Sequence, residues 1–343
     1  MGVLDRADRA QRDRPWIGFP LAVYQKFSDD QAGNLASLLA YYAFFSVFPL
    51  MLSMVTVLGF VLQGDPALEN KIFSTALGFF PIIGQHDALH PLRGSILALV
   101  IGLALALFSG LSVVSRAQVA FNTVLSVPRS DWPGFGPRIL RSLELLVIGG
   151  GGLVLTTLIS GAVTGAGSYG LTLGVGLRIL GAALAIVLDT LLFTVLFKRL
   201  TVRDVSWRQS LPGAAFAAVC WYGLQLGGTA LVAHELKGAS ATYGTFATVI
   251  GLLSFLHIEA QLTLYAAEIN AVRIDKLWPR GLRSMVNIPT TEADHRAYAS
   301  YAERDRMAHP DREQVNVHFP QKDGPQKDGP QKDGAQKDDD GHD

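Results

Sequence analysis

Charged side chains make up only 17% of this 343-residue chain, against roughly 25% in an ordinary soluble protein. Apolar side chains make up 49%, and the mean hydropathy is +0.29. Between Leu35 and Val272 the charges fall in short clusters separated by apolar runs of about 20 residues, the length of a helix that crosses a bilayer. This composition argues against a soluble domain and predicts an all-α integral membrane protein.

Cysteine is nearly absent, since Cys220 is the only one. A lone thiol excludes an intramolecular disulfide and a cysteine-rich zinc site. The N-terminal segment has arginines but no apolar stretch close behind them, so we expect no cleavable signal peptide and a first membrane helix that acts as an uncleaved signal. Basic residues do not gather with aromatic residues on one face, which argues against a nucleic-acid partner.

Motifs for catalysis and cofactor binding are incomplete. The GxGxxG at Gly165–Gly170 follows a membrane helix instead of a strand, and His234-Glu235 has Gly238 where HExxH requires a second histidine. No nucleophile is paired with a base, so we expect no enzyme activity, no cofactor and no metal. Close helix contacts are permitted at the small-residue segments Gly149–Gly152, Gly161–Gly165 and Gly223–Gly227.

Six apolar runs have the length of a membrane span. They cover approximately residues 35–62, 95–115, 139–163, 174–197, 211–233 and 244–272. Before them, Pro15–Phe27 carries aromatic and apolar residues among few charges, which predicts a helix in the membrane interface. Ser28, Asp29 and Asp30 then offer N-cap side chains for the first span, and Pro49 predicts a kink inside it.

The remaining segments are expected outside the bilayer. After Asp65-Pro66, the segment 63–92 has apolar residues at helical spacing, which predicts a short amphipathic helix on the outer surface. The segment 274–343 ends in QKDGP repeats with almost no apolar side chains, so we expect it to be largely disordered. It serves either as a passive solvated tail or as a tether for a partner.

Lys and Arg are distributed unevenly among the connections. Within residues 1–283, seventeen lie before the first run, between the second and third, between the fourth and fifth, and after the sixth, whereas the other connections hold four. Because basic connections stay in the cytoplasm, both termini are predicted to be cytoplasmic. Residues 1–283 carry 21 basic and 16 acidic side chains, a balance that suits anionic membrane lipids as partners.

The sixth run carries polar side chains at depths where they are costly. At about 100° per residue these side chains form two stripes on nearly opposite sides of a helix. One stripe contains Tyr243, Ser254, His257, Gln261, Tyr265 and Glu268, and the other contains Thr245, Thr248, Glu259, Thr263 and Asn270. A helix with two polar sides is predicted to lie inside the bundle, in contact with other helices or a wet cavity on both sides.

The strongest candidates for function lie near the middle of the predicted spans. Glu259 is roughly 20 Å from either end of the sixth run, with His257 and Gln261 on the opposite stripe. These residues form either a polar gate or proton-linked site, or a buried hydrogen-bonded network that fixes helix packing. Asp189 lies inside the fourth run, and a direct pair with His257 is one hypothesis for it. The full set of transport or polar-core candidates is Asp189, His257, Glu259, Gln261, Glu268 and Asn270.

Three sequence blocks extend over most of the predicted membrane body. They are NLASLLAYYAFFSVFPLML at Asn34–Leu52, RAQVAFNTVLSVPR at Arg116–Arg129, and WRQSLPGAAFAAVCW, ATYGTFATVIGLLSF and YAAEINAV between Trp207 and Val272. These blocks resemble the YihY/BrkB family of bacterial inner-membrane proteins, above all its YhjD-like actinobacterial members. The resemblance implies a six-helix membrane domain with cytoplasmic ends in the bacterial plasma membrane. It also suggests roles in envelope integrity and in lipid or lipopolysaccharide export.

Two functions are consistent with these observations. The leading hypothesis is a plasma-membrane transporter or flippase-like exporter of a lipid or another amphiphilic envelope component. The alternative is a structural or scaffold membrane protein whose polar groups only specify packing. The two-sided polar helix favours the first hypothesis, because intramembrane carboxylates usually mark functional sites.

Overall fold

A computed structural model of the chain describes residues 8, 11–61, 96–165, 175–243, 245–281, 291–308 and 314–319. Within these residues the regular structure is helical and includes no strand, which confirms the predicted all-α class. The helices are α2 (Pro15–Asp29), α3 (Ala32–Val61), α5 (Ile96–Val124), the 3-10 helix η1 (Arg129–Asp131), α6 (Phe135–Gly165), α7 (Val175–Leu200), α8 (Trp207–Tyr243), α9 (Thr245–Ile274) and α10 (Glu292–Arg304).

Five of the described helices are long and apolar enough to cross a bilayer. The qualifying segments are Ala32–Ser53 in α3, Leu99–Val124 in α5, Phe135–Thr156 in α6, Ile179–Leu200 in α7 and Val249–Ile274 in α9. The helix α8 covers the fifth predicted run but is not among these five in the described part of the chain. The count of six spans therefore stays a prediction.

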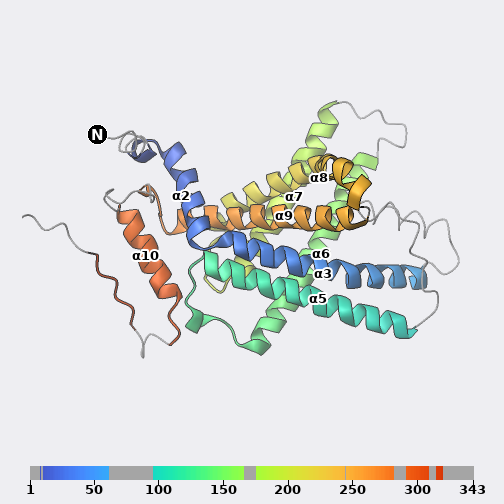
Figure 1. Ribbon diagram of the computed structural model, residues 1–343, viewed down its shortest axis with the longest axis horizontal. Coiled ribbons are helices and arrows are strands. Elements are labelled where there is room, and N and C mark those ends of the chain that lie inside the picture. The colour runs from blue at the N-terminus through green and yellow to red at the C-terminus, as the bar shows by residue number, and fades with distance from the viewer. Residues whose placement is uncertain are drawn as a thin grey trace, which may run out of the picture.

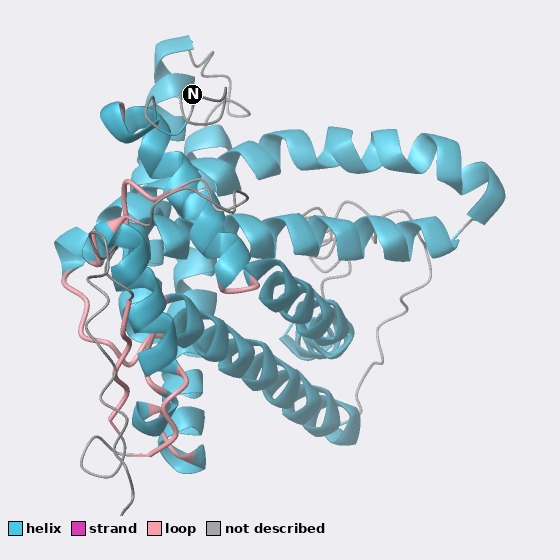
Figure 2. Cartoon of the chain, turned by 60° about the vertical axis from the view of Figure 1, so that its left-hand side comes forward, coloured by secondary structure: helices cyan, strands magenta, loops and turns pink. Residues whose placement is uncertain are grey.

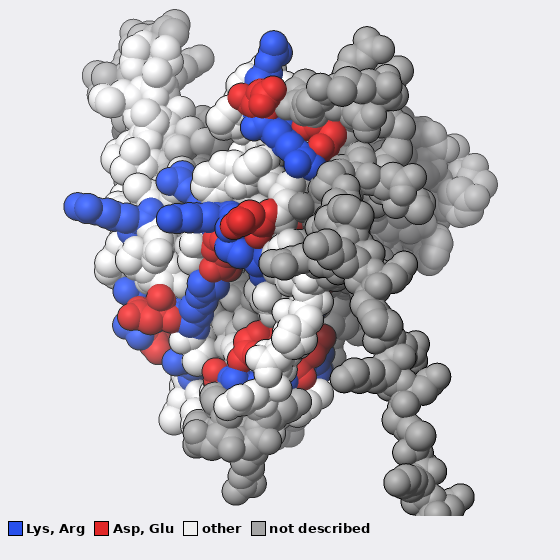
Figure 3. Space-filling model, turned by 90° about the vertical axis from the view of Figure 1, so that its left-hand side faces the viewer, with Lys and Arg blue, Asp and Glu red and all other residues white. Residues whose placement is uncertain are grey.

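The helix α9 occupies the centre of the bundle. It packs along α8 and along α3, and it also contacts α2 and α5. The helices α3 and α5 run beside each other, whereas α6 crosses the bundle obliquely and packs against α7 (Figure 1). The short helices α2 and α10 lie at one end of the long helices (Figures 1 and 2). We call this end, formed by α2, η1, α10 and the turns after α5, α7 and α9, the charged end, because acidic and basic side chains gather on it (Figure 3).

Polar side chains join the turns at the charged end. The Oδ1 atom of Asn122 accepts hydrogen bonds from Thr201 Oγ1 at 3.1 Å and from the Val202 amide at 2.9 Å. The Arg203 guanidinium donates to both carboxylate oxygens of Asp275, at 3.0 and 2.5 Å, and to a carbonyl just after α5 at 3.1 Å. These contacts connect the turn that follows α7 to the ends of α5 and α9.

The helices α8 and α9 approach each other closely near the start of α8. Asn270 bridges them, because its Oδ1 accepts a hydrogen bond from the Gly213 amide at 2.8 Å and its Nδ2 donates to the Ser210 carbonyl at 3.0 Å. A Cβ atom at Gly213 would collide with the Ala266 carbonyl and with the Asn270 side chain. Only glycine therefore fits this contact.

Only some of the other glycines make the close contacts that small residues permit. Gly152 of α6 packs against the Leu192 side chain of α7, and Gly149 also faces α7. Gly223 and Gly227 of α8 are exposed, and no described residue lies within 4 Å of the place where a Cβ would be. The close contact that these two positions permit is therefore not made within the described bundle, because small residues allow a close approach without requiring one.

The N-terminal part of the chain differs from prediction in one detail. The helix α2 covers the segment predicted to be interfacial, but Asp30 does not cap α3, because its buried carboxylate pairs with Lys26 and Arg304. Pro49 lies inside α3 without ending it, and the helix continues to Val61. The outer helix predicted at 63–92 and the QKDGP repeats lie outside the described residues.

Candidate functional site

The two polar stripes of α9 face different helices. Glu259 and Thr263 line a small cavity with residues of α7 and α8, and Asn270 binds the first turns of α8. On the other stripe, Tyr265 stacks on Phe27 of α2 with 3.9 Å between the ring centroids. Both sides of α9 therefore contact protein.

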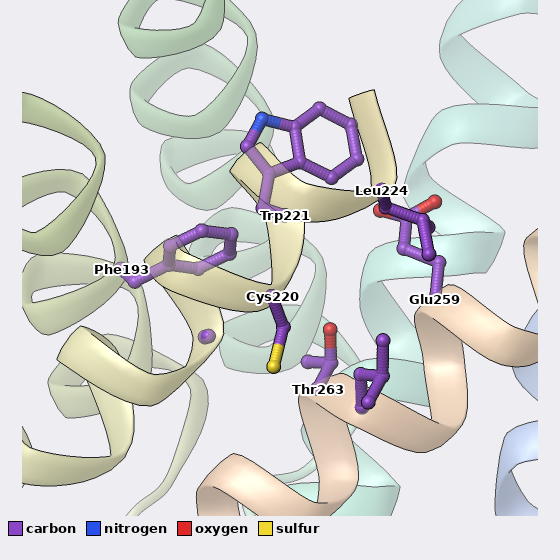
Figure 4. Close-up of a pocket in the computed structure, with 8 residues that line it drawn as sticks. Phe193, Cys220, Trp221, Leu224, Glu259 and Thr263 are labelled. Atoms are coloured by element: carbon purple, nitrogen blue, oxygen red, sulfur yellow. The ribbon is translucent and has the colours of Figure 1, made fainter. Parts of the chain in front are cut away.

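Glu259 faces a cavity of about 10 Å³, which has room for roughly one water molecule. The cavity is lined by Phe193 of α7, by Ala217, Cys220, Trp221 and Leu224 of α8, and by Glu259, Leu262 and Thr263 of α9. The Glu259 carboxylate lies beside Leu224 (Figure 4). It is half-buried, and among the described residues it makes no hydrogen bond or ion pair. An intramembrane carboxylate in such surroundings is a candidate for function.

His257 and Gln261 form a pair of their own on α9. Their Nε2 atoms lie 2.9 Å apart, and both side chains are half-buried. Because the Gln261 amide nitrogen is a donor, the His257 ring nitrogen accepts this hydrogen bond. In the described part of the chain no ion pair within 4 Å joins His257 to Asp189, so the structure does not form the pair that was one hypothesis for Asp189.

Asp189 lies between α7 and α6, with 6% of its surface exposed. Its polar neighbour is the Thr156 side chain of α6, whose hydroxyl also donates to the Leu153 carbonyl at 3.1 Å. Asp189 is not among the residues that line the cavity at Glu259. The midplane candidates thus occupy three separate places, and the residues described contain no group of three or more His, Cys, Asp or Glu side chains that could hold a metal.

A buried charge cluster of Lys26, Asp30 and Glu268 joins α2 to α9. Lys26 Nζ donates to Asp30 Oδ2 at 2.5 Å and to the Val124 carbonyl at 2.7 Å, and it lies 3.4 Å from Glu268 Oε2. All three charged side chains have 0% exposure. Burial alone lowers the pKa of Lys26, but the carboxylates of Glu268 and Asp30 more than offset this and raise it above its ordinary value. Lys26 is therefore charged.

Of the two carboxylates in the cluster, Glu268 depends more on Lys26 than Asp30 does. Among the described residues, neither of its carboxylate oxygens has a hydrogen-bond partner, so the 3.4 Å ion pair with Lys26 is what compensates its charge there. Asp30 is better supplied, because it also accepts a hydrogen bond from Arg304 of α10 at 2.7 Å. A buried carboxylate with a single ionic contact is sensitive to any movement of that contact.

A second set of buried ion pairs fixes the segment after α9. The Arg280 side chain is 1% exposed and pairs with Asp29 of α2 at 2.9 Å and with Asp294 of α10 at 3.0 Å. Burial alone lowers the pKa of Arg280, but its neighbours on α10 raise it overall. The two sets of pairs together hold α2, α9 and α10 against one another.

The sequence pattern did not predict the buried charge cluster. Lys26 falls on the same face of α2 as the buried apolar residues Ala22 and Val23. This placement was the available signal for a buried ion pair, because a buried cation needs an anionic partner. The partners could not be read from the pattern. Asp30 and Arg304, for example, are 274 residues apart.

Protonation of Asp294 is expected to loosen α10. Its carboxylate accepts hydrogen bonds from the Thr291 and Gly281 amides, at 2.9 and 3.0 Å, and from Arg280. Burial opposes ionisation, but these donors lower the pKa of Asp294 overall. Because the folded-state pKa lies below the ordinary value of about 3.9, the carboxylate stabilises α10 fully above that value and loses this effect as the pH falls through the folded-state pKa.

The measurement is the rate at which a protease active from pH 3 to pH 6 cleaves α10. At pH 6, Asp294→Asn should be cleaved roughly tenfold faster than the wild type, because charge-assisted hydrogen bonds are lost. The difference should shrink below about pH 4, where the Asp294 carboxyl of undocked α10 begins to take up a proton, and should vanish as the pH falls through the folded-state pKa. An unchanged ratio down to pH 3 would show that the Asp294 charge does not hold α10.

A family model described as Virulence factor BrkB matches residues 23–280. The chain belongs to the virulence factor BrkB family. The resemblance predicted from the three sequence blocks is therefore confirmed. The BrkB match begins within α2, contains α3 to α9 with the buried charge cluster, and ends at Arg280, before α10.

Two curated membrane proteins are similar to this BrkB-family chain. The Inner membrane protein YhjD of Escherichia coli (strain K12) is 25% identical over 290 residues, which cover 77% of this chain and 83% of the relative. A UPF0761 membrane protein of Azotobacter vinelandii (strain DJ / ATCC BAA-1303) is 27% identical over 259 residues, which cover 72% of this chain and 61% of the relative. No solved structure matches. The five apolar helices of this BrkB-family chain and the names of these two relatives both indicate a membrane protein.

Proposed function

We propose that this BrkB-family protein moves a lipid or another amphiphilic envelope component across the plasma membrane. Glu259 is the group on the path that binds a proton or the cationic part of the substrate. The observation that carries the proposal is its half-buried carboxylate, which faces a water-sized cavity between α7, α8 and α9 without a polar partner among the described residues.

A purely structural role fits Glu259 poorly. Buried polar groups that only fix packing are normally hydrogen-bonded, as Asn270 is to α8 and as Gln118 of α5 is to Ser142 of α6 at 2.8 Å. Glu259 lacks such a partner in the described bundle. A carboxylate kept in a membrane helix at this cost supports a role in binding or proton transfer.

The size of the cavity bears on the kind of substrate. A volume of about 10 Å³ does not admit a solute larger than water, so a substrate would have to move along the boundary between protein and lipid or wait for α8 and α9 to separate. An amphiphile can take the first route with its apolar part in the bilayer. The small cavity and the family resemblance both favour a lipid-like substrate.

Orientation follows from the distribution of basic residues. Arg129 belongs to η1 of the charged end, Arg138 lies in the first turn of α6 that follows it, and Arg199 lies in the last turn of α7. Basic connections are retained in the cytoplasm. The proposal therefore places the charged end, with both chain termini, in the cytoplasm. Anionic headgroups of that leaflet are its membrane partners.

The test is flux in vesicles of phosphatidylethanolamine and phosphatidylglycerol that contain the purified full-length protein. Transbilayer movement of a panel of fluorescent phospholipids would be followed with and without a proton gradient. Glu259→Gln should reduce flux by roughly tenfold or more. Thr263→Val is the matched control, because it changes the same cavity without removing a carboxylate, and it should keep most of the flux.

Asp189→Asn provides a second comparison, since Asp189 lies outside the cavity. A smaller effect than that of Glu259→Gln would agree with the separate positions of the two carboxylates. Equal flux for wild type and Glu259→Gln would remove Glu259 from the path. Absence of flux for every lipid tested, in protein that is folded and inserted, would favour the scaffold function.

A further inference from the structure

The helix α10 is docked on the charged end by polar and apolar contacts. Its start is capped by Thr291, whose hydroxyl accepts from the Asp294 amide at 3.1 Å. The Tyr301 hydroxyl donates to Asp29 of α2 at 3.2 Å, and Arg304 donates to Asp30 at 2.7 Å. Ala297 and Tyr301 of α10 also pack against a small apolar cluster that includes Val23 of α2 and Val272 of α9. Docking therefore combines hydrogen bonds and ion pairs with this apolar cluster.

A continuous series of charged contacts runs from α10 to the central helix. Arg304 binds Asp30, Asp30 binds Lys26 at 2.5 Å, and Lys26 lies 3.4 Å from Glu268 of α9. The Asp30 carboxylate is thus neutralised by two cations, Arg304 and Lys26. If Arg304 leaves, Asp30 has only Lys26 as its cation, and the ammonium is drawn toward Asp30 and away from Glu268. The position of α10 thus affects the charge balance at the base of α9.

The position of Glu268 on α9 gives this series a further consequence. Glu268 lies on the stripe that also carries Gln261 and His257, and α9 itself carries Glu259 on its other side. A helix is stiff along its axis, so a shift or rotation at its base moves the side chains one to three turns above it. The cavity at Glu259 lies within that distance.

We propose that α10 is a latch that holds α9 in the conformation seen here and that its release allows α9 to move. As a device that regulates transport, the latch rests on the proposed function. As a mechanical coupling between α10 and α9 it does not. The Arg304 side chain is 16% exposed, so the outer edge of the latch is accessible to water and to a competing partner.

The coupling is tested by amide hydrogen exchange with mass spectrometry on the full-length protein in the same vesicles. Arg304→Ala should increase exchange roughly tenfold in α10 and also in residues 264–274 of α9. Arg304→Lys, which keeps the charge, should restore most of the protection. Glu292→Gln is the matched control on α10, because its side chain is 96% exposed, and it should exchange like the wild type.

Peptides from residues 181–197 of α7 report whether the bundle remains folded, and Arg304→Gln offers a milder variant if Arg304→Ala unfolds it. Faster exchange in α10 without any change in residues 264–274 would overturn the latch, because α10 would then be docked without holding α9.

Flux through the same variants separates the two proposals. Flux that rises at least about threefold in Arg304→Ala supports the latch as a regulator, and flux at or below the wild-type rate overturns that role. If the wild type shows no flux while exchange in α9 still responds to Arg304, the transport proposal fails and the mechanical coupling stands.

Discussion

Replacing Lys26 with methionine is expected to lower the free energy of unfolding by about 3 to 5 kcal/mol, because it removes the cation from a buried charge cluster and leaves its carboxylates. Lys26 has 0% exposure and holds Asp30 at 2.5 Å and Glu268 at 3.4 Å. Methionine fills a similar volume without offering a donor, so the change isolates the charge from the packing. Reversible unfolding of the purified protein in mixed detergent measures the effect.

Two comparisons make the Lys26 result specific. Lys26→Met combined with Glu268→Gln should be less destabilised than Lys26→Met alone, since the carboxylate that lacks hydrogen bonds is then neutral. Arg129→Ala removes an exposed pair, 3.7 Å from Asp305 with side chains 53% and 61% exposed, and should cost less than about 1 kcal/mol. If Lys26→Met costs no more than Arg129→Ala, the cluster does not stabilise the fold.

Gly213→Ala is expected to destabilise the protein by about 3 kcal/mol or more, the upper end of the range for overpacking. The new Cβ would collide with the Ala266 carbonyl, which is backbone and cannot rotate away, and with the Asn270 side chain. The collision separates α8 from α9 and breaks the hydrogen bond from the Gly213 amide to Asn270, which is 2.8 Å long. Thermal unfolding monitored by size-exclusion chromatography reports the loss.

Gly223→Ala is the matched control on the same helix. No described residue lies within 4 Å of its added Cβ, so the substitution should be neutral or should stabilise α8 by about 0.5 to 1 kcal/mol through helix propensity. Similar destabilisation by both substitutions would mean that α8 resists any added methyl group. In that case the contact at Gly213 would not be the cause.

The helices could be predicted from the sequence because their signal is local. Apolar runs of bilayer length place α3, α6, α7 and α9 within a few residues of their observed bounds, and they place the start of α5, which continues past the predicted end at 115 to Val124. The two polar stripes of α9 could be predicted for the same reason, since helical geometry fixes which residues share a face. Glu259 could therefore be predicted as a candidate residue, but the cavity beside it could not.

Contacts between distant segments could not be predicted in this way. Glu268 is a candidate by its depth, but nothing near it in the chain indicates that Lys26 is its partner. The motif Gly223–Gly227 matches the pattern for close packing and lies on an exposed side of α8, whereas Gly213 makes the contact without belonging to such a motif. Side-chain spacing shows which approaches are sterically allowed, and the assembled bundle decides which of them occur.

The buried charge cluster also sets an order for biosynthesis. The helix α2 leaves the ribosome well before α10, yet Asp30 pairs with Arg304, which is synthesised 274 residues later. Until α9 and α10 emerge, Lys26 and Asp30 lack Glu268 and Arg304, and burying an incompletely compensated charge cluster costs free energy. The helix α2 is therefore expected to stay at the membrane surface until then. The helix α2 reaches its final docked position only when translation of the membrane body is complete. In a chain truncated before α9, we therefore expect α2 not to dock.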